Sequence, residues 1–262
     1  MTAYRQFASV YDRLMEHMPY ADWLRFARTI WEQQDLMPRT VVDLGCGTGN
    51  LSIPLAKSGF DVFAIDLSAD MLSIGRGKWE ESPRRAARSD GGSIRWLQQD
   101  MREWELPEPV DTIISFCDCL NYLTEPADVE DAFRASFQGL RTGGKFLFDV
   151  LPAAQLRRYA AAQPFTLDER DVAYIWTCEY DEAIQEIEHS LTIFARDGSD
   201  KAGRFVRIEE THVERAYDDQ WLIRALGRAG FSKVERYADF EARPLIGEAP
   251  QTAERLFYVA TK

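Results

Sequence analysis

Three glycines at alternate positions follow a short apolar run that contains an aspartate. Residues 41–56 read VVDLGCGTGNLSIPLA, in which the glycines are Gly45, Gly47 and Gly49. Glycine lets the chain pass close to a ligand and adopt positive φ without a side-chain clash. Two carboxylates accompany this loop: Asp43 lies within the run and Asp66 follows the next apolar run. We expect the ligand to bring hydrogen-bond donors to the loop, because Asp43 would repel a pyrophosphate.

The loop differs from two nucleotide-binding patterns. Asn50 stands where the dinucleotide pattern Gly-x-Gly-x-x-Gly places its third glycine, and no Gly-Lys-Ser or Gly-Lys-Thr follows for a nucleoside triphosphate. S-adenosylmethionine (SAM) fits better, because its ammonium and ribose hydroxyls suit carboxylates and its sulfonium tolerates no neighbouring fixed cation. A dehydrogenase is the least favoured alternative.

The elements that must position this loop alternate through the first 150 residues. Apolar runs lie at 41–44, 60–65, 93–98, 110–117 and 145–150, with helix-type stretches at 49–57, 69–78 and 127–140. Runs that are apolar on successive residues are typical of parallel strands covered on both faces. We therefore predict a doubly wound α/β fold with a mostly parallel sheet. In such folds ligands bind beyond the carboxyl ends of the strands, where the glycine loop falls.

The pattern changes after residue 150. Strands are predicted at 172–180, 184–195 and 204–215, with the turn DGSDKAG at 197–203, then a helix at 218–229 and strands at 232–240 and 255–261. The middle run alternates apolar and polar residues, which is typical of a half-exposed antiparallel sheet. We predict a core of residues 1–150 and 217–262 and a small antiparallel β insertion at 151–216.

The amino-acid composition and net charge limit the classes of molecule that the protein is expected to bind. The 262 residues carry a formal net charge of -12, from 43 acidic and 31 basic side chains, which disfavours nucleic acid and anionic lipid and favours a small-molecule substrate. The basic run Arg76 to Arg88 contains two glutamates and suits a solvated helix end. Four cysteines and three histidines lack metal-ligand spacing, so no metal is expected. Without a signal-like or membrane-spanning apolar run, we expect a soluble, cytoplasmic protein.

Four motifs resemble those of class I SAM-dependent methyltransferases, in that family's order and at its separations. They are VVDLGCGTGNLSIPLA (41–56), FAIDLSADML (63–72), WLQQDM (96–101) and DTIISFCDCLNYL (111–123), and LRTGGKFLFDV (140–150) is similar to the turn and fifth strand. The resemblance covers residues 1–150, and 218–262 by pattern. It implies a seven-stranded sheet, SAM as cofactor and S-adenosylhomocysteine as product.

The resemblance also implies cofactor-binding roles. Asp43 would anchor the ammonium directly or through water, Asp66 would accept hydrogen bonds from ribose, and Asp100 with the Met101 backbone would bind adenine beside Met71. The remaining positions that the motifs imply are Gly45, Cys46, Gly47, Gly49, Leu67, Gln99 and Cys117. Each aspartate has a structural alternative: Asp43 could cap local backbone, Asp66 could begin the turn before Ser68, and Asp100 could end a strand in solvent.

The segment FASVYDRLM (7–15) resembles one that small-molecule members fold over the cofactor, with a tyrosine, here Tyr11, facing the methyl group. An aromatic face near a sulfonium is electrostatically favourable. The alternative is an amphipathic helix that packs Phe7, Val10, Tyr11 and Leu14 on the sheet.

Asp118, Asn121 and Tyr122 follow strand 4, where relatives that methylate amino groups place polar residues around the acceptor. The pattern Asn/Asp-Pro-Pro-Tyr is absent, which argues against adenine-type acceptors. Of these residues, Tyr122 is a catalytic candidate.

The insertion at 151–216 resembles the antiparallel lid of glycine, sarcosine and aminosugar N-methyltransferases. Trp176, Tyr180, His189 and Glu210 could line an acceptor pocket there. His189 is a catalytic candidate with Tyr11 and Tyr122, although a lone histidine on an apolar strand face is also typical of simple packing. The lid could instead form a homodimer contact.

These observations predict a SAM-dependent methyltransferase that acts on a small molecule, at an amine nitrogen. The alternatives are an RNA or protein methyltransferase and a non-catalytic SAM-binding module, because fold and cofactor loop do not determine the acceptor.

Overall fold

The computed structural model describes residues 3–82, 91–197 and 203–262, without the side chains of residues 3–7 and 9. Three expectations lie outside this description: the packing of the Phe7 side chain, residues 83–88 of the basic run, and most of the turn at 197–203.

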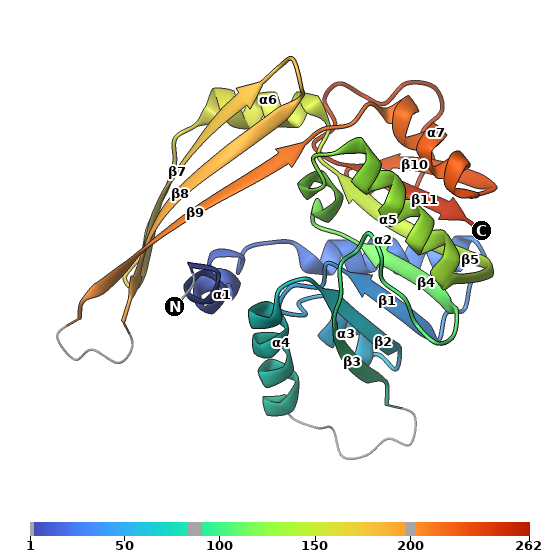
Figure 1. The fold of residues 1–262 in the computed structure, drawn as a ribbon, viewed down its shortest axis with the longest axis horizontal. Coiled ribbons are helices and arrows are strands. Elements are labelled where there is room, and N and C mark those ends of the chain that lie inside the picture. The colour runs from blue at the N-terminus through green and yellow to red at the C-terminus, as the bar shows by residue number, and fades with distance from the viewer. Residues whose placement is uncertain (1–2, 83–90, 198–202) are drawn as a thin grey trace.

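A seven-stranded sheet forms the core of the molecule (Figure 1). Its strands are β1 (Thr40–Leu44), β2 (Asp61–Asp66), β3 (Ser93–Gln98), β4 (Val110–Ser115), β5 (Leu140–Val150), β10 (Lys233–Ala238) and β11 (Leu256–Thr261), in the order β10-β11-β5-β4-β1-β2-β3. Strands β1 to β5 run parallel, and β11 is antiparallel to both β5 and β10. The predicted α/β fold is confirmed. The chain winds outward in both directions from β1, which leaves a crevice beyond its carboxyl end.

Helices cover both faces of this sheet. One face packs against α2 (Tyr20–Gln33), α3 (Ser52–Lys57) and α4 (Ala69–Glu81), and the other packs against α5 (Pro126–Gly139) and α7 (Asp219–Ala229). Helix α3 begins at Ser52 and not at residue 49 as predicted, because Gly49 still belongs to the loop, with φ +80°. Helix α2 has no counterpart in the sequence prediction.

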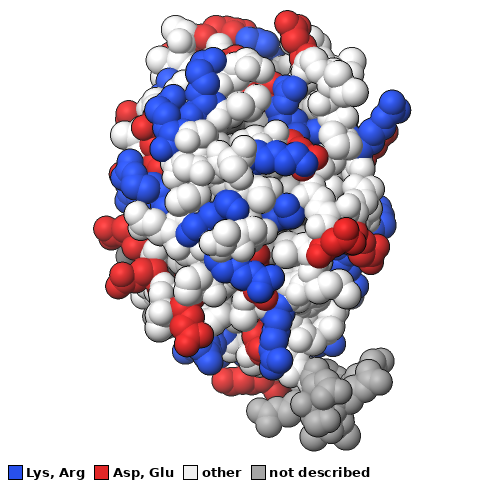
Figure 2. All heavy atoms as spheres, turned by 90° about the vertical axis from the view of Figure 1, so that its right-hand side faces the viewer, with Lys and Arg blue, Asp and Glu red and all other residues white. Residues whose placement is uncertain are grey.

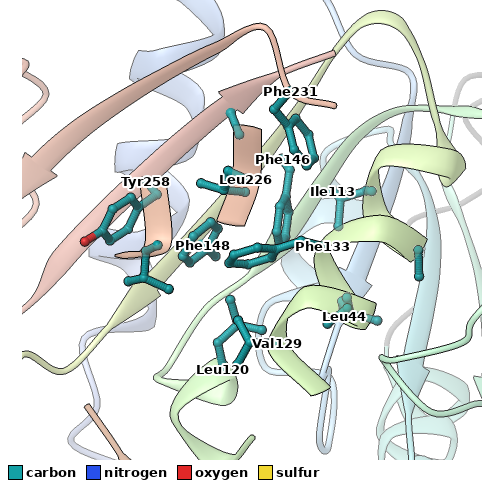
Figure 3. Packing of buried hydrophobic residues seen from close by; sticks show 14 of the residues in the cluster. Leu44, Ile113, Leu120, Val129, Phe133, Phe146, Phe148, Leu226, Phe231 and Tyr258 are labelled. Atoms are coloured by element: carbon teal, nitrogen blue, oxygen red, sulfur yellow. The ribbon is translucent and has the colours of Figure 1, made fainter. Parts of the chain in front are cut away.

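Aromatic rings fill the layer under α5 and α7 (Figure 3). Phe148 of β5 stacks on Tyr258 of β11 with ring centroids 4.9 Å apart, and Phe133 of α5 lies 5.4 Å from Phe148. All three side chains are fully buried, so they fix β5 and β11, whose ends border the crevice.

The chain between β5 and α7 forms a second, antiparallel sheet. It contains α6 (Ala153–Ala162), β6 (Phe165–Asp168), β7 (Val172–Asp181), β8 (Glu186–Arg196) and β9 (Phe205–Arg215), with the strands in sequence order. The sequence predicted three of these strands and missed β6 and α6. We propose that residues 1–150 and 217–262 form the core and that residues 151–216 form the insertion.

Helix α1 (Ala3–Leu14) lies between the insertion sheet and α4 (Figure 1). Ala8 and Val10 of α1 share one apolar cluster with Met71 of α4 and with buried residues of the insertion sheet, Val172, Ile193, Ala195 and Ile208. The insertion therefore contacts the α4 side of the core through the N-terminal helix.

Charges of both signs are interspersed on the face at the right of Figure 1, which Figure 2 shows directly. Lys and Arg alternate there with Asp, Glu and uncharged residues, and they do not form one continuous basic surface. In the part of the chain that the structure describes, no helix has the length and apolarity that a membrane span requires.

Asn121 was expected to lie around the acceptor, but it does not line the cleft. Its side chain instead joins the core to the insertion. Asn121 belongs to a short 3-10 helix, η1 (Cys119–Tyr122), and is fully buried. Its amide accepts a hydrogen bond from the Leu151 N–H and donates to the Leu151 and Arg215 carbonyls, at 2.9 to 3.1 Å. The hydrogen bonds of the Asn121 side chain therefore go to backbone groups at both ends of the insertion.

Replacing Asn121 with leucine should therefore destabilise the fold. Asn121→Leu keeps a similar volume but leaves three buried backbone groups without partners, each costing about 1–3 kcal/mol. Chemical denaturation should show a loss of about 3 kcal/mol or more in the free energy of unfolding, whereas the exposed control Gln251→Leu should change it by less than about 0.5 kcal/mol. Equal stability of both variants would contradict this role of Asn121.

Candidate functional site

A cleft of about 1170 Å³ lies beyond the carboxyl ends of the central strands. The glycine loop, α1, η1 and the inner face of the insertion sheet surround it. Sites for one small ligand usually enclose about 300–1000 Å³, so this cleft has room for two small molecules. A second hollow, of about 210 Å³, lies at the opposite ends of the strands near Thr40 and Asp61 and contains none of the predicted site residues.

All but one of the predicted catalytic and cofactor-binding residues line this cleft. They are Tyr11, Asp43, Gly45, Cys46, Gly47, Asp66, Leu67, Met71, Gln99, Asp100, Met101, Cys117, Tyr122 and His189. The exception is Gly49, where a Cβ atom would lie 2.5 Å from Cη2 of Trp96, so its missing side chain serves packing. Trp176 also lines the cleft, whereas Tyr180 and Glu210 do not.

The glycine loop brings backbone to the floor of the cleft. At Gly45, with φ +80°, a Cβ atom would lie 2.7 Å from Sγ of Cys119, so a side chain would displace the loop after β4. At Gly47, with φ +54°, no atom would lie within 4 Å of a Cβ atom. The open space above Gly47 is where a ligand can approach the backbone.

Asp43 is a buried carboxylate at the end of β1. It is 2 % exposed and accepts a hydrogen bond of 2.5 Å from the Ser52 hydroxyl. Burial raises its pKa to about 7. A positively charged group in the adjoining cleft would favour the charged form of Asp43, which fits an ammonium ligand.

Asp66 at the end of β2 is oriented by backbone amides. Its Oδ2 accepts from the Gly47 N–H at 2.7 Å, and its Oδ1 accepts from the Ser68 N–H at 2.8 Å. Each carboxylate oxygen keeps a further lone pair for a ligand hydroxyl. Asp66 therefore both begins the turn before Ser68 and lines the cleft, so the two interpretations of this residue are compatible.

Asp100 is held as an anion by a neighbour that the motif comparison missed. Arg102 donates to it from Nη2 at 2.6 Å and from Nε at 2.9 Å, and Nη1 of Arg102 also contacts Asp128 at 2.9 Å. These hydrogen bonds from Arg102 lower the pKa of Asp100. The carboxylate thus has a fixed position at the edge of the cleft.

A polar cluster attaches α1 to the glycine loop. Asp12 accepts from the Thr48 hydroxyl at 2.5 Å, from the Asn50 amide at 3.1 Å and from Lys78 of α4 at 2.8 Å. The next residue toward the N-terminus, Tyr11, lines the cleft, and burial raises its pKa well above the usual value. The sequence motif contained Asp12 but gave no indication of Lys78, which lies 66 positions away.

The loop after β4 has an unusual backbone that a buried carboxylate supports. Cys117 and Asp118 adopt φ of +63° and +55°, a region that costs non-glycine residues about 1–2 kcal/mol each. Asp149 of β5 accepts from both of their N–H groups, and Arg255 forms ion pairs with Asp118 and Asp149. Sequence reasoning missed Arg255 and Asp149, although a charged residue inside the apolar run of β5 was a usable signal.

The insertion sheet supplies the roof of the cleft. The indole N–H of Trp176 donates to Nδ1 of His189 at 3.0 Å, and Nε2 of His189 lies 3.7 Å from Oε1 of Glu214. Indole nitrogen is only a donor, so Nδ1 accepts and the proton of the neutral ring is assigned to Nε2. Burial, assisted by His212, lowers the pKa of His189 to about 4.

Carboxylates outnumber cations along the cleft. Among the described residues that line it, seven are acidic and two are arginines, namely Asp43, Asp66, Asp70, Asp100, Asp118, Asp128 and Glu214 against Arg102 and Arg255. This excess favours positively charged ligands. Within the described ranges, no group of three or more His, Cys, Asp and Glu side chains could hold a metal ion.

Comparisons with known proteins identify the family and the fold of the chain. A family model described as a methyltransferase domain matches residues 41–144. The chain is 36 % identical to a methyltransferase-family protein of Geobacillus sp. (strain WCH70) over 99 % of both chains. It is similar to the crystal structure of a SAM-dependent methyltransferase from Clostridium acetobutylicum ATCC 824, with a TM-score of 0.82, 26 % identity and 99 % of both chains covered. A sugar N-methyltransferase from Streptoalloteichus sp ATCC 53650 shares the fold, with a TM-score of 0.67, 18 % identity, and 94 % of this chain and 87 % of that one covered.

The low pKa of His189 has a consequence for stability at acid pH. In unfolded chains histidine has a pKa of about 6.5, and in this fold His189 has one of about 4, so between these values the unfolded chain binds a proton that the folded chain does not. Lowering the pH through this window therefore favours unfolding. Between pH 7 and pH 5 the wild type should lose up to about 2 kcal/mol more unfolding free energy than His189→Asn, measured by denaturant titration. Parallel losses in both proteins would contradict a neutral, buried His189.

Proposed function

We propose that this chain, which belongs to the SAM-dependent methyltransferase family, transfers a methyl group to an amine nitrogen of a small molecule. The family membership establishes SAM as its cofactor. The observation that carries the amine assignment is the excess of carboxylates over arginines in a cleft with room for two small molecules. An ammonium or amine is the acceptor group that such a lining favours.

The residues at the carboxyl ends of β1, β2 and β3 fit the cofactor. Gly47 leaves open backbone, Asp43 is a buried carboxylate suited to an ammonium, and Asp66 retains free lone pairs for ribose hydroxyls. Asp100 and the backbone of Met101 would bind the adenine. When bound, SAM supplies a methyl carbon on a positively charged sulfur that leaves as a neutral thioether.

The chain itself would contribute alignment, enclosure and proton removal. An in-line displacement needs the acceptor nitrogen held against the methyl carbon and water kept out. Tyr11 and Tyr122 line the cleft, and an aromatic face favours a nearby positive charge. His189 lies in the roof of the cleft and accepts a hydrogen bond from Trp176. This hydrogen bond favours a structural role for His189 over a role in proton transfer.

An RNA or protein methyltransferase is a weaker interpretation, because carboxylates dominate the lining of the cleft and the net charge of the chain is -12. A homodimer through the insertion stays a prediction. Ile175 and Phe205, on the face of the sheet turned away from the cleft, are 50 % and 45 % exposed and offer apolar surface for one.

The proposal is tested by a turnover screen. The protein is incubated with SAM and with matched amines and alcohols, and S-adenosylhomocysteine is quantified. We expect turnover with amines, with mass spectrometry placing the methyl group on nitrogen. Turnover confined to hydroxyl groups, RNA or protein would contradict the proposal, and no turnover with any class would favour a non-catalytic SAM-binding module.

Asp66 provides a test of the cofactor site. Asp66→Asn removes the charge, and hydrogen bonds to a charged group contribute about 1.5–3 kcal/mol. Calorimetry should show S-adenosylhomocysteine binding about tenfold to a hundredfold more weakly. The control Asp61→Asn, at the opposite end of the same strand, should bind like the wild type. Unchanged affinity of Asp66→Asn would remove this residue from the cofactor site.

A further inference from the structure

We propose that the carboxylate of Glu214, on the inner face of the insertion sheet, binds the ammonium group of the acceptor and removes its proton. The inference rests on the proposed function and assigns to one residue the selection of an amine. Sequence reasoning did not identify Glu214.

Glu214 is a buried carboxylate with unused hydrogen-bonding capacity. Glu214 is 5 % exposed and lines the cleft. Its Oε2 has no hydrogen-bond partner among the described residues. The other oxygen, Oε1, lies 3.7 Å from Nε2 of His189. A buried carboxylate oxygen without a donor is costly, so Oε2 is suited to receive a donor from a ligand.

The neighbouring cation does not satisfy Glu214. Arg255 contacts Asp118 at 2.8 Å and also forms an ion pair with Asp149, so one guanidinium serves two other carboxylates. Burial and, to a smaller extent, Asp118 raise the pKa of Glu214 well above its usual value, and Arg255 and the Tyr122 hydroxyl oppose this only in part. A cationic ligand would supply the missing positive charge, whereas a neutral alcohol would not.

The hydrogen bonds of His189 make Glu214 the better proton acceptor. The lone pair on Nδ1 of His189 is occupied by the Trp176 indole, and Nε2 carries the proton. The ring therefore presents a donor toward Glu214 and no free lone pair toward the cleft. Glu214 is the residue of this pair that can take a proton.

The proton step balances without a further reagent. One N–H bond of the acceptor ammonium breaks, its electrons stay on nitrogen as the lone pair, and the proton bonds to Oε2 of Glu214. The nitrogen then bonds to the methyl carbon while the carbon–sulfur electrons remain on sulfur. After the methylated ammonium leaves, Glu214 returns its proton to water.

Matched amine and alcohol probes test the inference. Binding of ring compounds such as cyclohexylamine and cyclohexanol is measured at pH 7 by ligand-observed NMR, in the presence of S-adenosylhomocysteine. The proteins are the wild type, Glu214→Gln and the control Glu188→Gln, whose carboxylate is exposed on the other face of the same sheet. The wild type and Glu188→Gln should bind amines at least tenfold more tightly than alcohols. Glu214→Gln should lose that preference while its alcohol binding and S-adenosylhomocysteine affinity stay unchanged.

Two results would overturn the assignment. One is an amine preference that survives in Glu214→Gln, in which case the amine acceptor remains supported by the turnover screen but another residue selects it. The other is a wild type that binds no amine in preference to its alcohol. If the turnover screen finds no amine substrate, the proposed function itself fails, whatever the probes show.

Discussion

The arrangement around the cleft depends on one fully buried carboxylate, Asp149 at the end of β5. It accepts hydrogen bonds from the Trp23 indole of α2 and from the backbone of Cys117 and Asp118, and it forms an ion pair with Arg255. Three other parts of the chain therefore meet at the side chain of Asp149. These bonds hold the loop after β4 in a left-handed conformation that its residues would otherwise avoid. A buried charge persists only when its hydrogen bonds are complete, so the conformation of the loop and the charge of Asp149 support each other.

The cleft is negatively charged because the cations that line it are already paired with carboxylates. Both arginines among the described lining residues already form ion pairs, Arg102 with Asp100 and Asp128, and Arg255 with Asp118 and Asp149. Asp43 and Glu214 are buried, and among the described residues neither has an arginine or lysine partner of its own. Burial raises the pKa of both carboxyl groups. A positively charged ligand in the cleft would therefore stabilise the ionised form of each. The two residues lie on opposite walls, one in the core sheet and one in the insertion.

Local patterns in the sequence predicted the scaffold well, since each depends on neighbours in the chain. Successive apolar residues indicated buried parallel strands, and the spacing of Gly45 and Gly47 after an apolar run indicated where the chain approaches a ligand. What the sequence could not supply were pairings between distant positions. Arg255 and Asp149 are 106 residues apart, and a side chain at Gly49 would collide with Trp96 of β3. Asn121 followed a strand as acceptor-binding residues do, yet its amide is consumed by the backbone of residues 151 and 215. A pattern gives the type of residue at a position, and only the fold gives its partner.

Helix α1 (Ala3–Leu14) contributes to the architecture of the cleft. Tyr11 and Leu14 line the cleft, while Ala8 and Val10 pack against both α4 and the insertion sheet. Helix α1 is thus a wall of the cleft and also the contact through which the insertion sheet reaches α4. Without α1, the cleft would lose the side wall that Tyr11 and Leu14 form and would be more open to bulk water.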